Sequence, residues 1–311
     1  MTAPETAQLV RFAAQTQYQD IPAAAIGESK RCILDFLGVA IGAKEAAAPR
    51  IALESVRVLG GAPQAHVLAY GDLTSVANAA LVDGILSHVL DFDDTHIPTI
   101  LHASGPILAA ALPLAEWKRL SGKELLAAHA VAFEVAARVS LALYPQHYDA
   151  GWHMTGTTGT LGAAAAAARL LGANAGQLTH AIGIAGTQAA GHREQFGAMT
   201  KSLHCGKAAS NGLLAGLLAV RGYTAADDSL QGRRGMFQTM SPAADASQLT
   251  EGLGERWEIF RNGFKPYACG VVTHPAIDAV RQLGSRQGVR AADVERIELR
   301  VHPLVLELTG K

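Results

Sequence analysis

Carboxylates, histidines and lysines gather in a few short stretches of an otherwise alanine-rich chain. The densest is Leu90–Ser104 (LDFDDTHIPTILHAS), which holds Asp91, Asp93 and Asp94 together with two threonines and two histidines. Residue types of this kind can bind a metal ion, exchange protons with a substrate, or simply form a solvated loop between two helices. The spacing alone leaves all three interpretations open.

A metal site here would resemble the Asp-rich motif of the isoprenoid synthases, which bind magnesium diphosphate. Those enzymes need a second acidic motif on a facing helix and usually an aromatic-lined pocket. Only Asp227 and Asp228 offer a second motif, in a predicted loop beside Arg233 and Arg234, and aromatic residues make up only 5% of the chain. The sequence therefore favours a site without a metal, and we predict no other cofactor.

Three further stretches place a histidine or a lysine near a predicted helix start. His153 lies in a glycine- and threonine-rich segment, Lys201 precedes an apolar helix that Thr200 or Ser202 would cap, and Lys265 lies in the segment FKPY. Taken alone, such a histidine is more often a buried hydrogen-bonding residue than a catalyst, and such a lysine is usually solvated. Together, beside helix N-termini, they suit a small polycarboxylate. They also suit the removal of a proton next to a carboxylate while cations hold the developing charge.

Helical periodicity dominates the chain up to about residue 260 and supplies the elements that would position these residues. Ser75 is typical of an N-cap for the helix that precedes the aspartates. The pattern predicts helices over Ile21–Gly42, Val76–Leu90, Pro106–Leu120, Lys123–Tyr144, Gly159–Leu171, Ala175–Ala189, Leu203–Arg221 and Ala246–Leu253.

The pattern changes near Trp257. Ile259–Phe264 has a strand-like composition, Thr273–Leu283 has helical spacing, and Val294–Val301 (VERIELRV) alternates as a half-exposed strand does. One helix and one or two strands cannot form an independently stable sheet. We therefore predict a mainly α protein, with an all-helical domain in residues 1–258. Residues 259–311 would form the N-terminal part of a smaller α/β domain, incomplete in this chain.

Composition narrows the possible partners. The net charge of −1 and the absence of a basic run argue against nucleic acid. The longest uninterrupted apolar runs, such as Gly212–Val220, are far shorter than the roughly 20 residues that span a bilayer. The three cysteines form no CxxC pair, and the N-terminus lacks a signal-peptide pattern. We expect a cytoplasmic protein.

Several long blocks resemble the MmgE/PrpD family, which includes 2-methylcitrate dehydratase, cis-aconitate decarboxylase and iminodisuccinate epimerase. The blocks are SHVLDFDDTH, HASGPILAAALPLAE, GWHMTGTTGTLGAAAAAARLLG, FGAMTKSLHCGKAASNGLLAGLLA and FKPYACGVVTHPAID. The resemblance implies a large all-α domain with a smaller α/β lid, usually in a homodimer, and an active site between the two. It also implies an enzyme of di- or tricarboxylates that needs neither metal nor cofactor.

The resemblance further implies the site residues. Asp91, Thr95, His102, His153, Lys201 and Lys265 fall at family active-site positions, and Tyr148 of HYDAGWH is a further candidate acid or base. In the predicted chemistry Lys201 or His153 removes the proton. His102 and Lys265 bind substrate carboxylates, while Asp91 and Thr95 orient His102. The loop residues Asp93, Asp94 and His96 are then expected only to carry the others.

The leading expectation is a carbon–oxygen lyase, most simply a dehydratase of the 2-methylcitrate type. The alternatives are an epimerase of an imino- or amino-dicarboxylate, a decarboxylase of the cis-aconitate type, and an inactive carboxylate-binding scaffold. Some family members have a histidine shortly after the FKPY lysine, where this chain has Ala268, Cys269 and Gly270. This departure argues against the decarboxylase. The incomplete lid favours the inactive scaffold.

Overall fold

The computed structural model describes residues 2–310, and the chain divides into two compact units, Met1–Phe264 and Lys265–Lys311. Each unit is described by itself. The main helices of the first unit are α1 (Pro4–Gln15), α2 (Ala23–Gly42), α3 (Ala47–Leu59), α4 (Val76–His88), α5 (Ser104–Lys118), α6 (Gly122–Leu143), α7 (Gln146–Asp149), α8 (Met154–Leu170), α9 (Ala175–Gly186), α10 (Thr200–Ala219) and α11 (Met236–Met240). The second unit contains α12 (His274–Gln287) and α13 (Pro303–Thr309). The predicted mainly α fold is confirmed.

Strands are few and short in the described chain. β1 (Ala65–His66) pairs antiparallel with β2 (Leu73–Thr74), and β3 (Thr95–His96) pairs antiparallel with β4 (Asn262–Gly263). The second pair ties the aspartate-rich loop to the end of the first unit, with Thr95 opposite Gly263.

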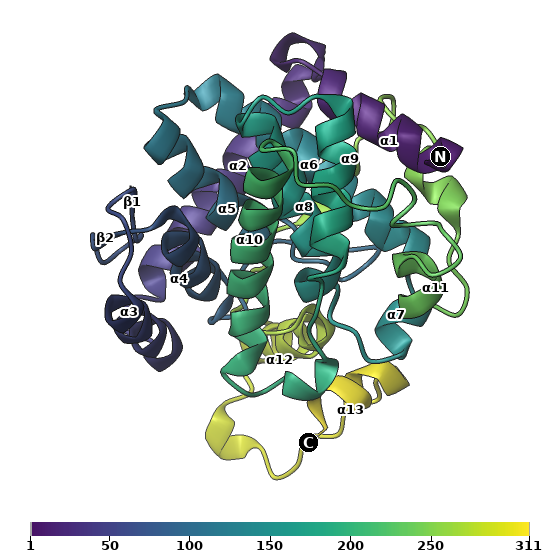
Figure 1. Ribbon diagram of the computed structural model, residues 1–311. Coiled ribbons are helices and arrows are strands. Elements are labelled where there is room, and N and C mark those ends of the chain that lie inside the picture. The colour runs from purple at the N-terminus through teal and green to yellow at the C-terminus, as the bar shows by residue number, and fades with distance from the viewer. Residues whose placement is uncertain (1, 311) are drawn as a thin grey trace. The chain divides into compact units, whose positions relative to one another are not determined.

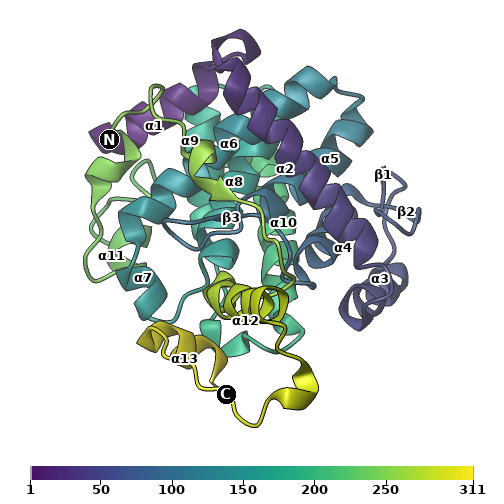
Figure 2. The same ribbon diagram turned by 180° about the vertical axis from the view of Figure 1, so that it is seen from behind.

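The α8 helix lies at the centre of the first unit. It packs against α5, α6, α9 and α10, and α10 packs in turn against α4. Figure 1 shows α10 crossing in front of α8, and Figure 2 shows α2 crossing the opposite face. All six alanines of Ala163–Ala168 are fully buried. The run lies inside the predicted helix Gly159–Leu171, and its small side chains let neighbouring helices pack closely.

Glycines let the backbones of α4, α8 and α10 touch. A Cβ added at Gly84 of α4 would lie 2.6 Å from the Cα of Gly206 in α10. A Cβ added at Gly212 would lie 2.5 Å from the Cβ of Ala163 in α8. Real Cβ atoms do not approach so closely, and close packing leaves no room to relax. The spacing of these helices is therefore set by direct backbone contact.

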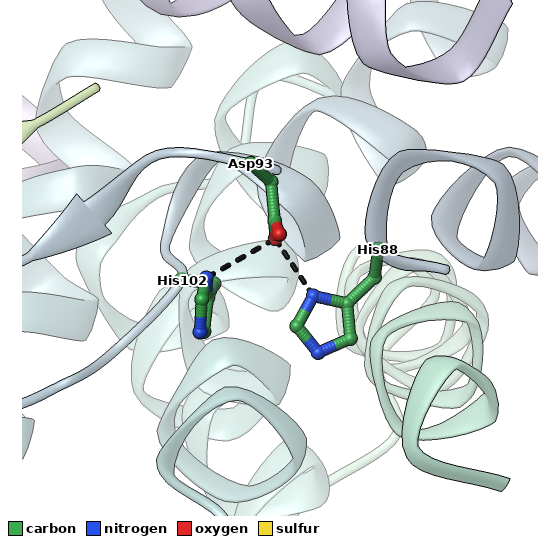
Figure 3. A group of neighbouring side chains, drawn as sticks. All are labelled: His88, Asp93 and His102. Atoms are coloured by element: carbon green, nitrogen blue, oxygen red, sulfur yellow. Dashed lines mark hydrogen bonds and ion pairs between the residues drawn. The ribbon is translucent and has the colours of Figure 1, made fainter. Parts of the chain in front are cut away.

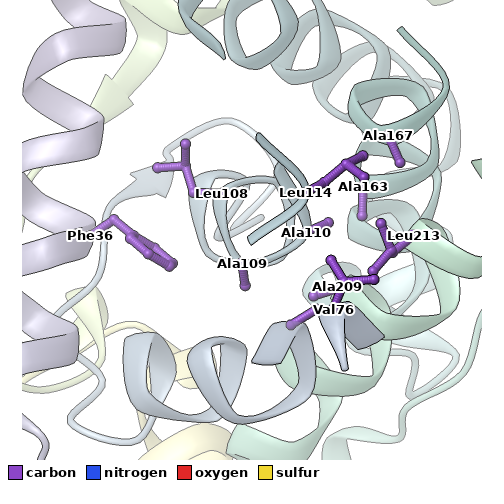
Figure 4. Close-up of a cluster of buried hydrophobic side chains, with 11 residues drawn as sticks. Phe36, Val76, Leu108, Ala109, Ala110, Leu114, Ala163, Ala167, Ala209 and Leu213 are labelled. Atoms are coloured by element: carbon purple, nitrogen blue, oxygen red, sulfur yellow. The ribbon is translucent and has the colours of Figure 1, made fainter. Parts of the chain in front are cut away.

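Larger apolar side chains pack around these backbone contacts between α4, α8 and α10. Phe36 of α2, Leu108 and Leu114 of α5, and Leu213 of α10 belong to one buried cluster (Figure 4). The Sγ atom of Cys205 fills the gap beside Gly105, where an added Cβ would lie 2.8 Å from it. The cluster joins helices that are far apart in the sequence.

The α6 helix is long and apolar enough to cross a membrane, but 83% of its most apolar window is buried inside the protein. It also carries a buried ion pair, in which Arg138 Nε donates to Glu134 Oε2 at 3.0 Å. Arg138 donates further to the backbone carbonyls of Glu251 and Arg256 at 2.9 and 2.8 Å. These features are those of a core helix.

Most predicted helices are confirmed, with shifted ends. Ser75 caps α4 by accepting a hydrogen bond from the Asn78 backbone N–H, as predicted. The α8 helix begins at Met154 rather than at the predicted Gly159. The hydroxyls of Thr158 and Thr160 donate to the backbone carbonyls of Met154 and Gly156, one turn earlier in the same helix. Neither Thr200 nor Ser202 is the cap of α10, which begins at Thr200 after Met199.

Two predictions near the end of the chain are wrong, and a third is correct only in part. Ala246–Leu253 is not an α-helix: only Ala246–Leu249 is helical, as a short 3-10 turn. Val294–Val301 is not a strand, because an alternating pattern needs a partner strand and none pairs with it in the described residues. The predicted strand-like segment Ile259–Phe264 is a 3-10 turn, Glu258–Arg261, followed by β4.

Candidate active site

Three helix ends and one loop bring a group of polar side chains together in the first unit. His88 is the last residue of α4, His153 is the N-cap of α8, and Lys201 lies in the first turn of α10. The loop after α4 supplies Asp93, and His102 comes shortly before α5. Because α4, α8 and α10 are in backbone contact, these ends are held at fixed separations.

Asp93 is the centre of the group. Its Oδ2 atom lies 2.7 Å from His88 Nδ1 and 3.3 Å from His102 Nδ1 (Figure 3). The three residues are at most 5% exposed. Figure 3 shows the carboxylate on one side of the two rings, with the far nitrogen of each ring pointing away from it toward the same side. One carboxylate thus orients both imidazoles, whose ring planes are 70° apart.

These contacts fix where each ring carries its proton. The Nδ1 atom of His102 also faces the backbone oxygen of Asp94 at 3.1 Å and the hydroxyl of Thr95 at 3.3 Å. A carbonyl and a carboxylate only accept hydrogen bonds, so Nδ1 of both rings must be the donor. In a neutral imidazole the other nitrogen is then an unprotonated acceptor. A neutral ring held in this way presents Nε2 as its acceptor.

Burial and charge act together on the protonation of this group. Burial lowers the pKa of His88 to about 4, with Lys201 and His102 acting in the same direction and Asp93 opposing them. For Asp93, burial acts to raise the pKa, but the contacts with His102 and His88 bring it well below its usual range. We therefore treat Asp93 as ionised and His88 as neutral near pH 7.

A second imidazole pair lies next to the first. His153 Nδ1 and His204 Nδ1 are 3.0 Å apart, so one of them donates and the other accepts. The His153 ring stacks on His88 with centroids 5.6 Å apart and meets Phe196 edge-on at 5.0 Å. Burial is the main cause that lowers the pKa of His204 to about 4 and that of His153 well below its usual range. Both rings are neutral near pH 7.

Lys201 adds a positive charge at the edge of this histidine group. Its Nζ lies 2.7 Å from Asp91 Oδ1, with the lysine side chain 17% exposed. Asp91 has a positive φ of 49°, a conformation that few residues other than glycine, asparagine and aspartate adopt readily. The turn aims the carboxylate of Asp91 at α10, which offsets the unfavourable position of an aspartate just after the end of α4.

Behind the loop, Asp94 forms a separate buried network. Its Oδ2 accepts hydrogen bonds from Ser104 Oγ and, at 2.7 Å, from Asn262 Nδ2, while His129 Nε2 lies 3.2 Å from the serine oxygen. Burial raises the pKa of Asp94 to about 6. His96 similarly contacts Glu258 at 3.2 Å, both side chains being fully buried. These bonds anchor the loop to the rest of the first unit.

The geometry also allows a test of the metal interpretation. Among the described residues, His88, Asp93 and His102 have potential ligand atoms within 4.8 Å of one another. Two ligands of a tetrahedral zinc ion, each 2.0–2.2 Å from the metal, lie roughly 3.3 Å apart. The 2.7 Å contact between Asp93 and His88 is shorter and has the length of a hydrogen bond. We assign the arrangement as a hydrogen-bonded one.

The structure brings together five of the predicted site residues: Asp91, Thr95, His102, His153 and Lys201. Tyr148 lies in α7, with the Arg193 guanidinium 3.9 Å above its ring. Lys265 begins the second unit. The placement of Tyr148 and Lys265 at this site stays a prediction.

Asp93 does more than carry the other site residues, since it contacts two imidazoles, and two residues of the group were missed. Asp93, Asp94 and His96 are buried and bonded, because the turn after α4 folds inward against α10 and α5 rather than into solvent. His88 and His204 were not predicted as site residues. His88 lies in an apolar helix, but its position five residues before Asp93 was a usable signal.

Buried imidazoles beside a lysine, on a helical frame, can exchange protons and pair with an anion. The MmgE/PrpD N-terminal domain matches residues 7–249, and the MmgE/PrpD C-terminal domain matches residues 267–311. The chain belongs to the MmgE/PrpD family.

Curated relatives carry the name cis-aconitate decarboxylase. The chain is 30% identical over 296 residues to that of Aspergillus terreus, covering 90% of this chain and 60% of the relative. It is 30% identical over 292 residues to the human protein, covering 89% and 60%, and 29% identical over 293 residues to the mouse protein, covering 89% and 59%. The chain thus spans about 60% of the length of these relatives.

Proposed function

We propose that the protein is a lyase acting on a small tricarboxylate by proton transfer through its own side chains. The observation that supports this most is the buried, neutral His88 imidazole held by Asp93, with His153 stacked on it and the Lys201 ammonium at the edge of the same group. Relatives named cis-aconitate decarboxylase support a tricarboxylate as the substrate class. The required steps use only acids, bases and cations that this group supplies.

His153 is the better candidate for the base, and Lys201 for the cation. The His153 ring is buried and neutral, so it has a nitrogen lone pair available near pH 7. Lys201 is instead engaged in an ion pair with Asp91. In a dehydration, His153 takes the proton next to a carboxylate, and Lys201 holds the charge that develops on that carboxylate. The β-hydroxyl then leaves as water, after receiving a proton from an acid of the site.

A decarboxylation uses the same groups in the opposite sense. A protonated imidazole gives its proton to an alkene carbon of the substrate. The bond to the leaving carboxylate breaks, its electron pair forms the shifted double bond, and carbon dioxide is released. The names of the relatives favour this outcome. Dehydration remains the second candidate, because Ala268, Cys269 and Gly270 stand where some family members have a histidine.

The experiment that tests the proposal is product analysis by NMR in deuterated water. The purified chain is incubated with cis-aconitate, citrate, 2-methylcitrate and iminodisuccinate. Loss of carbon dioxide identifies decarboxylation, loss of water identifies dehydration, and solvent deuterium at the α-carbon without net loss identifies epimerisation. Decarboxylation or dehydration of a tricarboxylate supports the proposal. Binding of all four acids without reaction would contradict it in favour of an inactive carboxylate-binding scaffold.

A further inference from the structure

One nitrogen of His88 has no hydrogen-bond partner among residues 2–310. Its Nδ1 donates to Asp93 at 2.7 Å, whereas its Nε2 is buried and has no hydrogen-bond partner within the described residues. Buried polar atoms are nearly always bonded, and an exception points to a missing partner. This nitrogen faces the same side as the far nitrogen of His102 (Figure 3). A ligand between the rings would supply the missing partner.

A carboxylate ligand cannot pair with His88 in its neutral form. Because Nδ1 carries the proton, Nε2 is an acceptor, and a carboxylate oxygen is also an acceptor. A bond forms only if Nε2 gains a proton. The protonated ring would keep its contact with Asp93 and would lie at the carbonyl end of α4, where the helix dipole favours a positive charge.

We propose that a polycarboxylate bound at this site accepts a hydrogen bond from His88 Nε2, and that His88 takes up the proton for this bond from solvent as the ligand binds. The inference rests on the proposed function, since it assumes a polycarboxylate ligand. It adds His88 to the binding residues and couples binding to one proton. The imidazolium then lies between two anions, the Asp93 carboxylate and the ligand.

The groups around His88 explain why the proton arrives only with the ligand. Asp93 alone favours the charged ring, while Lys201 and His102 oppose it together with burial. His153 stacks on the ring from α8, and His204 lies behind it on α10. On the α2 side, Asp35 accepts a hydrogen bond from the backbone N–H of Asp94. An added anion reverses this balance.

Calorimetry measures the coupling directly. The full chain is titrated at pH 7.5 with tricarballylate, citrate and cis-aconitate, in buffers that differ in ionisation enthalpy. We expect an uptake of about one proton per site, with affinity falling about tenfold for each pH unit of increase. In His88→Gln the uptake should fall toward zero. The control His66→Gln, which changes an exposed histidine beside Glu116, should leave it unchanged.

Nitrogen-15 NMR of the unmutated protein assigns the proton without relying on a buried substitution. Both ring nitrogens of His88 should become protonated when a ligand binds. His129, which lies in the separate Asp94 network and whose pKa burial lowers to about 3, should stay neutral in the same spectrum. Binding with His88 still neutral would overturn the inference and leave the proposed function intact. If none of the three acids binds or reacts, both are overturned.

Discussion

At the scale of single residues, Asp93 should determine the protonation pattern of the site. Both Nδ1 atoms face the same Oδ2, so an asparagine presents either its oxygen, which accepts from both rings, or its amide nitrogen, which donates to both. Because the amide carries no charge, Asp93→Asn should lower the share of the Nδ1–H tautomer in His88 and His102. We expect turnover to fall by roughly 10²–10⁴-fold, as loss of a positioned base does. Nitrogen-15 NMR reads the tautomers and initial rates read the turnover.

The neighbouring carboxylate provides the control for this change. Asp94→Asn alters an equally buried aspartate that bonds Ser104 and Asn262 instead of the two rings. Its unfolding temperature should drop while the tautomers of His88 and His102 stay as they are. Equal losses of turnover in the two variants would show that Asp93 acts only through stability.

Lys201 is predicted to act as the cation of the site. Lys201→Met removes the charge that pairs with Asp91 and should lower turnover by roughly 10²–10³-fold, since a positioned charge in a partly buried site is worth several kcal/mol. Lys207→Met changes an exposed lysine on the same helix and serves as the matched control. Steady-state rates on the reactive acid compare the two. Similar rates for both variants would remove Lys201 from the mechanism.

At the scale of elements, the contact between α4 and α10 should tolerate no added methyl group. A Cβ at Gly206 would lie 2.3 Å from the backbone oxygen of Leu81, so Gly206→Ala must separate the helices. Overpacking of this kind costs about 1–3 kcal/mol of unfolding free energy. Gly38→Ala is the control: it lies inside α2 with nothing within 4 Å, and alanine there should stabilise by about 0.5–1 kcal/mol.

Denaturant unfolding of the two variants checks this prediction. Separation of the helices would also displace His88 from Lys201 and His204, so Gly206→Ala should lose turnover as well as stability. A Gly206→Ala protein as stable as the unmutated one would show that α4 and α10 are less tightly packed than the structure indicates.

The elements also show what sequence reasoning can reach. Periodicity and the Ser75 cap predicted most helices, because a helix face records its own burial in residues three and four apart. The prediction of a strand over Val294–Val301 was wrong because a strand needs a partner strand, which the local alternating pattern does not specify. His88 was missed because α4 is apolar on nearly all sides, so no polar face marked it. Its role arises only when the loop folds back and places Asp93 against it.

At the scale of the whole molecule, stability should depend on pH through buried histidines. Burial lowers the pKa of His88, His129, His147 and His204 to between about 3 and 4, from the ordinary 6.5. Below pH 6.5 the unfolded chain binds protons at these histidines and the folded chain does not. These groups therefore stabilise the fold fully only above pH 6.5. That contribution is lost as the pH falls from 6.5 toward 4.

Three buried acids partly compensate. Burial raises the pKa of Asp94 to about 6, that of Glu134 to about 7 and that of Asp83 well above its usual range, which favours the folded state as the pH falls through the same range. The histidines outnumber these acids, so we expect a net loss of stability as the pH falls. The midpoint of urea unfolding at pH 7.5 and at pH 5 measures this loss. A higher midpoint at pH 5 would contradict the predicted balance.

The rate at which Cys205 is alkylated should report how often the helices around the site separate. Its thiol is fully buried, lies 3.6 Å from Ser87 Oγ and fills the gap beside Gly105, so an alkylating reagent reaches it only after α4 and α10 part. Half-buried Cys269 supplies the fast reference in the same sample. Peptide mapping by mass spectrometry would follow both labels. A bound tricarboxylate should slow the labelling of Cys205 in proportion to its saturation, because the opened state has lost the ligand's site.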